Sequence, residues 1–221
     1  INKSLKRQDP YTRSHPLDRN RIRALTRLTS TQPNYSISLE HKYLFSRLHT
    51  KLAAFRIDPE WALKNPPSNK HLELMQKAIA NHRLGKAQRA INFIKDLVTL
   101  KPRDPYYREV QGQILLDNRR YSAAIGAYQE ATQRAPKDPL ILGGYGKTLL
   151  TQNNQINNIK ALEVLKIAQN LDGKDANILH HLGRAFSRSG QIGEAALATA
   201  KRYALQGDIK NAILQAQRAE A

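Results

Sequence analysis

The chain has 221 residues, 40% of them apolar, and its 36 lysines and arginines against 18 acidic residues give a formal net charge of +18. No uninterrupted apolar run reaches about 18 residues, so no transmembrane helix is predicted, and the absence of cysteine excludes disulfides and thiolate metal sites. The positive charge either is a solvated surface or favours an acidic protein partner or an anionic lipid headgroup; nucleic acid is disfavoured, because no nucleic-acid-binding motif accompanies the charge.

The amino-terminal third is the most densely basic part of the chain. The first 70 residues carry 14 basic and 5 acidic side chains, which is half of the net charge. Within them a short helix is predicted over residues 19–28, where Ile22, Leu25 and Leu28 fall on one side. The polar residues 29–34 end this helix.

A longer helix is predicted next, from apolar residues at intervals of four, four and three: Leu44, Leu48, Leu52 and Phe55. This apolar face has no other partner in the chain, so we expect it to pack against the helices that follow residue 68. Residues 58–63 form a short helical turn, and residues 65–68 form a linker. We therefore interpret residues 1–67 as a junction with a helical collar.

The remainder of the chain, residues 68–221, contains a repeat. Four marks recur 34 residues apart: Ala90 and Ala124, Pro102 and Pro136, Asp104-Pro105 and Asp138-Pro139, and Gly112 and Gly146. Aspartate caps the free amides at a helix start, proline suits the first helical position, and small residues let two helices approach closely. The spacing is the tetratricopeptide repeat (TPR) period. The alternative is an ordinary helical bundle whose alanines coincide by chance.

Alignment on these marks divides the repeat region into helix-pair units: 71–102, 105–136, 139–173 and 176–206, with a terminal half-unit at 208–220. The third unit contains extra polar residues at 152–158, which we expect to form a loop between its two helices. The predicted fold is all-α: a right-handed TPR solenoid of helix pairs with an amino-terminal helical collar.

In such a solenoid the first helices of successive units line the concave face. Positions two, five, nine and twelve of each unit are the candidate lining: Leu72, Met75, Ile79, His82, Tyr106, Glu109, Gln113, Leu116, Leu140, Gly143, Lys147, Leu150, Asn177, His180, Arg184 and Ser187. The apolar side chains of the first unit either line this face or pack against the preceding domain or a capping helix. The candidate binding residues are polar or basic, and they include one residue a turn beyond the lining: Tyr106, Gln113, Lys147, His180, Arg184 and Arg188.

A short motif precedes the first helix. Residues 9–17 read Asp-Pro-Tyr-Thr-Arg-Ser-His-Pro-Leu. Further features follow it in order: Arg19, Arg21, Ile22, the helix over 43–55, Trp61-Ala62-Leu63, and repeats ending in residues 195–200. This combination resembles the junction after the catalytic domain of BepA-like zinc metallopeptidases with TPR tails. The resemblance implies an origin in the carboxy-terminal part of an envelope metalloprotease, periplasmic or associated with the outer envelope, with its targeting segment upstream.

No catalytic residue is predicted in this chain. Zinc peptidases of that family use His-Glu-x-x-His, which is absent here, and no Gly-x-Ser-x-Gly elbow is present either. We therefore expect the fragment to be neither an enzyme nor a zinc protein, whereas the resemblance implies a parent zinc metalloendopeptidase. His15 is the one candidate metal ligand, a regulatory ligand to a zinc held by the missing domain; the alternative is a histidine in a surface loop.

The function predicted from these features is protein interaction. The repeats would recruit or position a partner or an unfolded substrate protein with acidic segments for the metalloprotease, in contact with its own catalytic domain. The alternative is a free-standing TPR scaffold or assembly protein that binds an acidic partner. The carboxylate clamp of lysine and asparagine used by some TPRs is absent, so a carboxy-terminal carboxylate is not the expected ligand.

Overall fold

The computed structural model describes residues 18–30 and 37–220, and every regular element within them is an α-helix. The helices are α1 (Asp18–Ser30), α2 (Leu39–Arg56), α3 (Pro59–Lys64), α4 (Lys70–Arg83), α5 (Ala87–Leu100), α6 (Pro105–Asp117), α7 (Tyr121–Arg134), α8 (Pro139–Leu149), α9 (Gln155–Leu171), α10 (Ala176–Arg188), α11 (Ile192–Leu205) and α12 (Ile209–Glu220). The junction motif with His15 lies outside the described residues.

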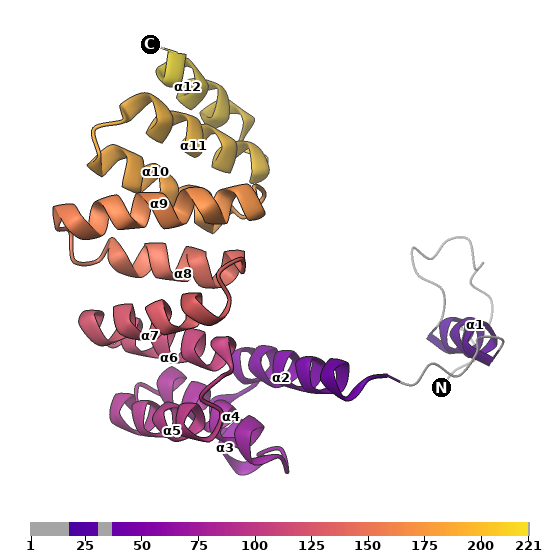
Figure 1. Ribbon diagram of the computed structural model, residues 1–221. Helices are drawn as coiled ribbons and strands as arrows, with labels where there is room; N and C mark the ends of the chain where they lie inside the picture. The colour runs from indigo at the N-terminus through magenta and orange to yellow at the C-terminus, as the bar shows by residue number, and fades with distance from the viewer. Residues whose placement is uncertain (1–17, 31–36, 221) are drawn as a thin grey trace. The chain divides into compact units, whose positions relative to one another are not determined.

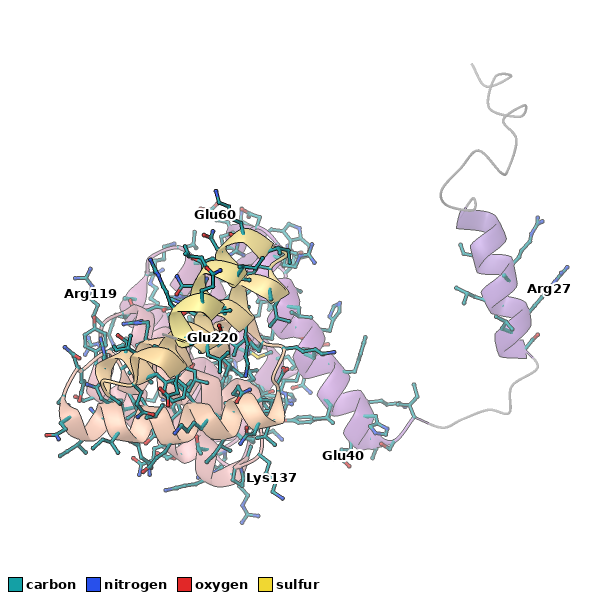
Figure 2. The ribbon with its side chains drawn as sticks, turned by 90° about the horizontal axis from the view of Figure 1, so that it is seen from above. Arg27, Glu40, Glu60, Arg119, Lys137 and Glu220 are labelled. Carbon is teal, nitrogen blue, oxygen red and sulfur yellow. The ribbon has the colours of Figure 1, made fainter. Side chains whose placement is uncertain are left out.

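The chain divides into two compact units, residues 1–45 and 46–221. The boundary falls inside α2, so residues 46–67 of the predicted collar group with the repeats. In the first unit, α1 spans the predicted short helix, and its three apolar residues Ile22, Leu25 and Leu28 are exposed. Arg27 and Glu40 extend outward from their helices (Figure 2).

In the second unit, the helices from α4 onward pack as successive antiparallel pairs that stack in chain order (Figure 1). The helix starts follow the sequence marks. The carboxylates of Asp104 and Asp138 accept hydrogen bonds from the backbone amides of Tyr106 and Ile141, and a proline occupies the first turn of both α6 and α8. The same capping occurs at Asp175, which starts α10. These caps set the register of each first helix.

The extra residues of the third unit are divided between a loop and a helix. The polar stretch 152–158 was expected to be loop, but α9 begins at Gln155 and runs for 17 residues, against 14 in α5, α7 and α11. The reason is local: the Asn154 side chain accepts a hydrogen bond from the amide of Asn157 and starts the helix early. The insertion therefore lengthens a helix.

Of the four residues of the collar helix α2 predicted to pack against the repeats, only Phe55 packs against their core. Leu48 and Leu52 are 56% and 54% exposed, whereas Thr50 and Ala54 are buried, Ala54 in one cluster with residues of α4 and α5. Leu72, Met75 and Ile79 of the first repeat are buried in the same cluster as Ala54. They are therefore core residues and do not form an open lining.

Candidate functional site

The collar helix α2 covers the part of the first-helix face that belongs to the second repeat, residues 105–136. Arg47 Nη1 lies 2.7 Å from Asp104 Oδ2, and Lys51 Nζ lies 2.5 Å from Glu109 Oε2. The Arg47 guanidinium also stacks 4.0 Å from the centroid of the Tyr106 ring. Two predicted lining residues, Tyr106 and Glu109, are thus engaged by the chain's own basic residues.

Tyr106 is held in place by its hydroxyl as well as by its ring. The hydroxyl donates a 2.6 Å hydrogen bond to Asp138 Oδ2. This bond to a carboxylate, with partial burial, raises the pKa of Tyr106 to about 12. The side chain therefore links the second repeat to the start of the third repeat, and its contacts are those of a structural residue.

Beyond the collar, the first helices α6, α8 and α10 enclose an open pocket of about 310 Å³. Of the predicted binding residues, Gln113 and Lys147 line it. So do four further members of the predicted lining: Glu109, Leu140, Gly143 and Asn177. The alignment on the repeat period therefore brings together side chains that are up to 68 residues apart in sequence.

The remaining predicted residues lie on α10 and have different surroundings. His180 and Arg184 are exposed. Arg188 turns instead toward the end of α8, where its guanidinium donates to the carbonyl of Leu150 and, at 3.2 Å, to Asn158 Oδ1. Arg188 thus satisfies a carbonyl at a helix carboxyl end, which is a structural contact.

His181 was not among the predicted binding residues, yet it lines the pocket. Burial, together with the neighbouring charges of His180, Lys147 and Arg184, lowers its pKa to about 4. Its Nδ1 atom is buried with no hydrogen-bond partner within the described residues. The imidazole is therefore neutral at physiological pH and adds a polar group, not a charge, to the pocket wall.

The cations around His180 and His181 form what we call the basic cluster: Lys147, Arg184 and Arg202. Burial lowers the pKa of His180, and so do Arg202 and Arg184; Lys147 and Arg184 both act on His181. Charges that act on adjacent imidazoles lie close together, so three elements, α8, α10 and α11, contribute to one positive region. Arg202 was missed because it sits on a second helix, outside the positions taken as lining.

Two classes of feature are absent from the part of the chain that the structure describes. No three histidine, aspartate or glutamate side chains there are grouped so as to hold a metal ion. None of its helices combines the length and apolar character needed to cross a bilayer.

A pH prediction follows from His181. Its pKa is about 4 in the folded chain and 6.5 when unperturbed, so between these values the unfolded chain binds a proton that the folded chain does not. We expect the free energy of unfolding to fall as the pH is lowered through this window. His181→Gln should remove on the order of 1 kcal/mol of that loss, after allowance for partial exposure.

The measurement is urea denaturation of the wild type and the variant at pH 7 and at about pH 4.5. His41→Gln, at an exposed histidine in the first unit, is the control. If the pH dependence of stability were the same in all three proteins, the burial of His181 would not contribute to it.

Comparison with known proteins supports the repeat assignment. The sequence model of the tetratricopeptide repeat family matches residues 75–139 and 109–171. A search of curated proteins finds no match. The repeats predicted from the 34-residue spacing are therefore confirmed over residues 75–171.

Solved structures of MamA proteins are similar in fold. One, of residues 41 to the end of MamA from Desulfovibrio magneticus RS-1, is 23% identical, has a TM-score of 0.59, and the match covers 74% of this chain and 94% of that one. A MamA of AMB-1 is 15% identical with a TM-score of 0.60, covering 74% of this chain and 98% of that one. At these identities the likeness establishes the fold, and the predicted all-α TPR solenoid is confirmed.

Proposed function

We propose that this TPR-containing chain is a protein-interaction module whose first-helix face binds an acidic segment of a partner protein. TPR solenoids commonly present such a face to other proteins. The observation that carries the proposal is the open pocket, with Lys147 on its wall and Arg184 nearby. Neither side chain has a hydrogen-bonding or ionic partner within the described residues, so both are available to a ligand.

The charge distribution along the face favours an acidic ligand. At the collar end, the carboxylates of Asp104 and Glu109 are neutralised by Arg47 and Lys51. Beyond it, no ion pair joins a carboxylate to the basic cluster within the described residues, although Asp175 lines the same pocket as Lys147. Cations gathered in one concavity reinforce each other's field, so an anionic partner segment is the natural complement.

A protein ligand is favoured over a lipid surface by shape. Lys147 of the basic cluster lines a pocket between three helices, α6, α8 and α10, to which Leu140 and Ile178 add an apolar part. An extended chain can enter such a recess and place alternate side chains against its walls. A flat headgroup layer reaches only protruding cations, and apolar walls add nothing to its binding.

Two settings suit a module of this kind. In one, the chain is the recruiting region of a BepA-like zinc metallopeptidase in the periplasm or at the outer envelope, where the catalytic domain holds zinc and His15 approaches that zinc as a regulatory ligand. This setting is supported by the sequence resemblance of residues 9–17 and the features after them. In the other, the chain is a free-standing scaffold. The upstream coding sequence decides between them, because the first setting requires His-Glu-x-x-His there.

The proposed function is tested by the double variant Lys147→Glu with Arg184→Glu. With a labelled poly-glutamate peptide as the probe, we expect binding at least tenfold weaker than that of the wild type, because two attractive contacts become repulsive. Wild-type binding should also weaken steeply as salt is added. Fluorescence anisotropy measures both effects, and circular dichroism should show unchanged helicity, since both side chains are exposed.

The matched control reverses two exposed lysines on second helices, Lys95→Glu on α5 with Lys160→Glu on α9. It changes the net charge of the chain by the same amount. If the two double variants bound the peptide equally, attraction would come from the overall charge, and the groove would not be the binding site.

A further inference from the structure

The floor of the pocket contains a tyrosine that is fixed in position. Tyr128 of α7 is 3% exposed and lines the pocket. Its ring lies between two glycines: a Cβ added at Gly112 would come 2.5 Å from Tyr128 Cδ2, and one added at Gly144 would come 2.5 Å from Cε1 and 2.8 Å from the hydroxyl oxygen. The hydroxyl end of the ring is therefore the end next to Gly144, which also lines the pocket.

That hydroxyl has no hydrogen-bond partner within the described residues. Its oxygen is not among the buried side-chain atoms left without a partner, so it stays accessible from the pocket, where water or a ligand can bond it. Burial raises the pKa of Tyr128, and the nearby carboxylates of Glu109 and Asp117 raise it further. The phenol therefore stays protonated and is a hydrogen-bond donor directed at the pocket.

The other polar groups of the pocket indicate which kind of ligand the pocket would bind. Its two carboxylates are already satisfied: Glu109 by Lys51 at 2.5 Å, and Asp175 by the amides of Asn177 and Ile178 at 2.7 and 3.3 Å. The unused groups include donors, namely the Tyr128 hydroxyl, the Lys147 ammonium and the side-chain amides of Gln113 and Asn177. A ligand that accepts hydrogen bonds and carries negative charge would satisfy them.

We infer that the pocket is a subsite for one carboxylate side chain of the acidic segment, an Asp or Glu whose oxygens accept hydrogen bonds from the Tyr128 hydroxyl and the Lys147 ammonium. The inference rests on the proposed function and adds to it the group that enters the recess. Gly144 is part of this subsite, because any side chain there would occupy the space beside the hydroxyl. The basic cluster beyond the pocket then attracts the rest of the segment.

The test removes one oxygen atom. Tyr128→Phe keeps the ring between the two glycines and deletes the hydroxyl, so we expect about tenfold weaker binding of the poly-glutamate peptide, as for the loss of a hydrogen bond to a charged group. Thermal stability should not fall, because the hydroxyl has no hydrogen-bond partner among the described residues. Tyr145→Phe is the matched control: Tyr145 is 6% exposed and does not line the pocket.

Two further measurements test the chemistry of the ligand and control for a folding defect in Tyr128→Phe. A poly-glutamine peptide should bind more weakly than poly-glutamate, and Tyr128→Phe should change its binding little. Lys147→Ala, at an exposed residue, should weaken poly-glutamate binding without affecting stability. Equal binding of the two peptides would overturn the assignment of a carboxylate.

The results separate this inference from the proposed function. If Lys147→Glu with Arg184→Glu abolished binding while Tyr128→Phe left it unchanged, the groove would still bind an acidic segment, and the tyrosine subsite would be wrong. If neither change affected binding, both proposals would fail together.

Discussion

Ala54→Asp is expected to destabilise the compact part of the chain, residues 46–221, by about 3 kcal/mol or more. Leu48→Asp on the same helix should change stability by no more than about 0.5 kcal/mol. Ala54 is fully buried in a cluster with residues of α4, α5 and α6, so an aspartate there would be an unpaired charge in an apolar environment. Leu48 is 56% exposed, so its replacement by aspartate leaves the charge in water.

Chemical denaturation of the two variants measures this difference directly. From the sequence alone the opposite order is predicted, since Leu48 belongs to the apolar face assigned to packing. A large loss of stability at Leu48 together with a small one at Ala54 would return α2 to the orientation predicted from its leucines. It would also remove the collar from the first-helix face.

Gly146→Ala is expected to destabilise the chain by about 2 kcal/mol, although alanine is the better helix former. Gly146 lies in α8, and a Cβ added there would overlap the side chain of Leu165, which is fully buried. Overpacking of this kind costs about 1 to 3 kcal/mol. Displacing Leu165 is energetically costly, because its cluster joins helices of the second, third and fourth repeats.

Gly126→Ala supplies the matched control. Gly126 also lies inside a helix, α7, but a Cβ added there meets nothing within 4 Å. Only the gain in helix propensity remains, so this change should stabilise the chain by up to about 1 kcal/mol. Thermal unfolding of the two variants should therefore shift in opposite directions. Shifts of the same sign would show that Gly146 is not a point of close helix approach.

The repeat itself could be predicted because its marks are local and recur. Asp104 and Asp138 start helices by accepting hydrogen bonds from backbone amides two and three residues further along the chain. Gly146 has no side chain, so it permits close approach by any neighbouring helix. The fixed spacing then places Gln113 and Lys147 on one face. These inferences need only helical geometry and the period, and they brought together two residues of the observed pocket.

The orientation of α2 could not be predicted in the same way. Its leucines do recur on one side, but the ion pairs of Arg47 and Lys51 with Asp104 and Glu109 link residues 57 and 58 positions apart. No local pattern encodes such a pairing. Small residues such as Thr50 and Ala54 give almost no signal in a hydrophobic period, yet they are the buried ones in α2.

The candidate site shows the same limit. Arg184 and Arg188 are one helical turn apart, so spacing alone gives them a shared face, but Arg188 reaches the carbonyl at the end of α8. His181 sits beside a predicted residue, His180, but is not at one of the four lining positions of its repeat. Most of the rest of the pocket wall comes from earlier helices, so the place of His181 in the pocket depends on how the repeats pack.

The central claim is that an acidic segment binds in the pocket formed by α6, α8 and α10. The most direct measurement is to titrate the isotope-labelled chain with the poly-glutamate peptide and to follow its backbone amide resonances. We expect the largest shifts at Gly143, Gly144 and Lys147 and around His181, and none of comparable size on α5 or α9. Shifts concentrated on those second helices, or outside the repeats, would contradict the claim.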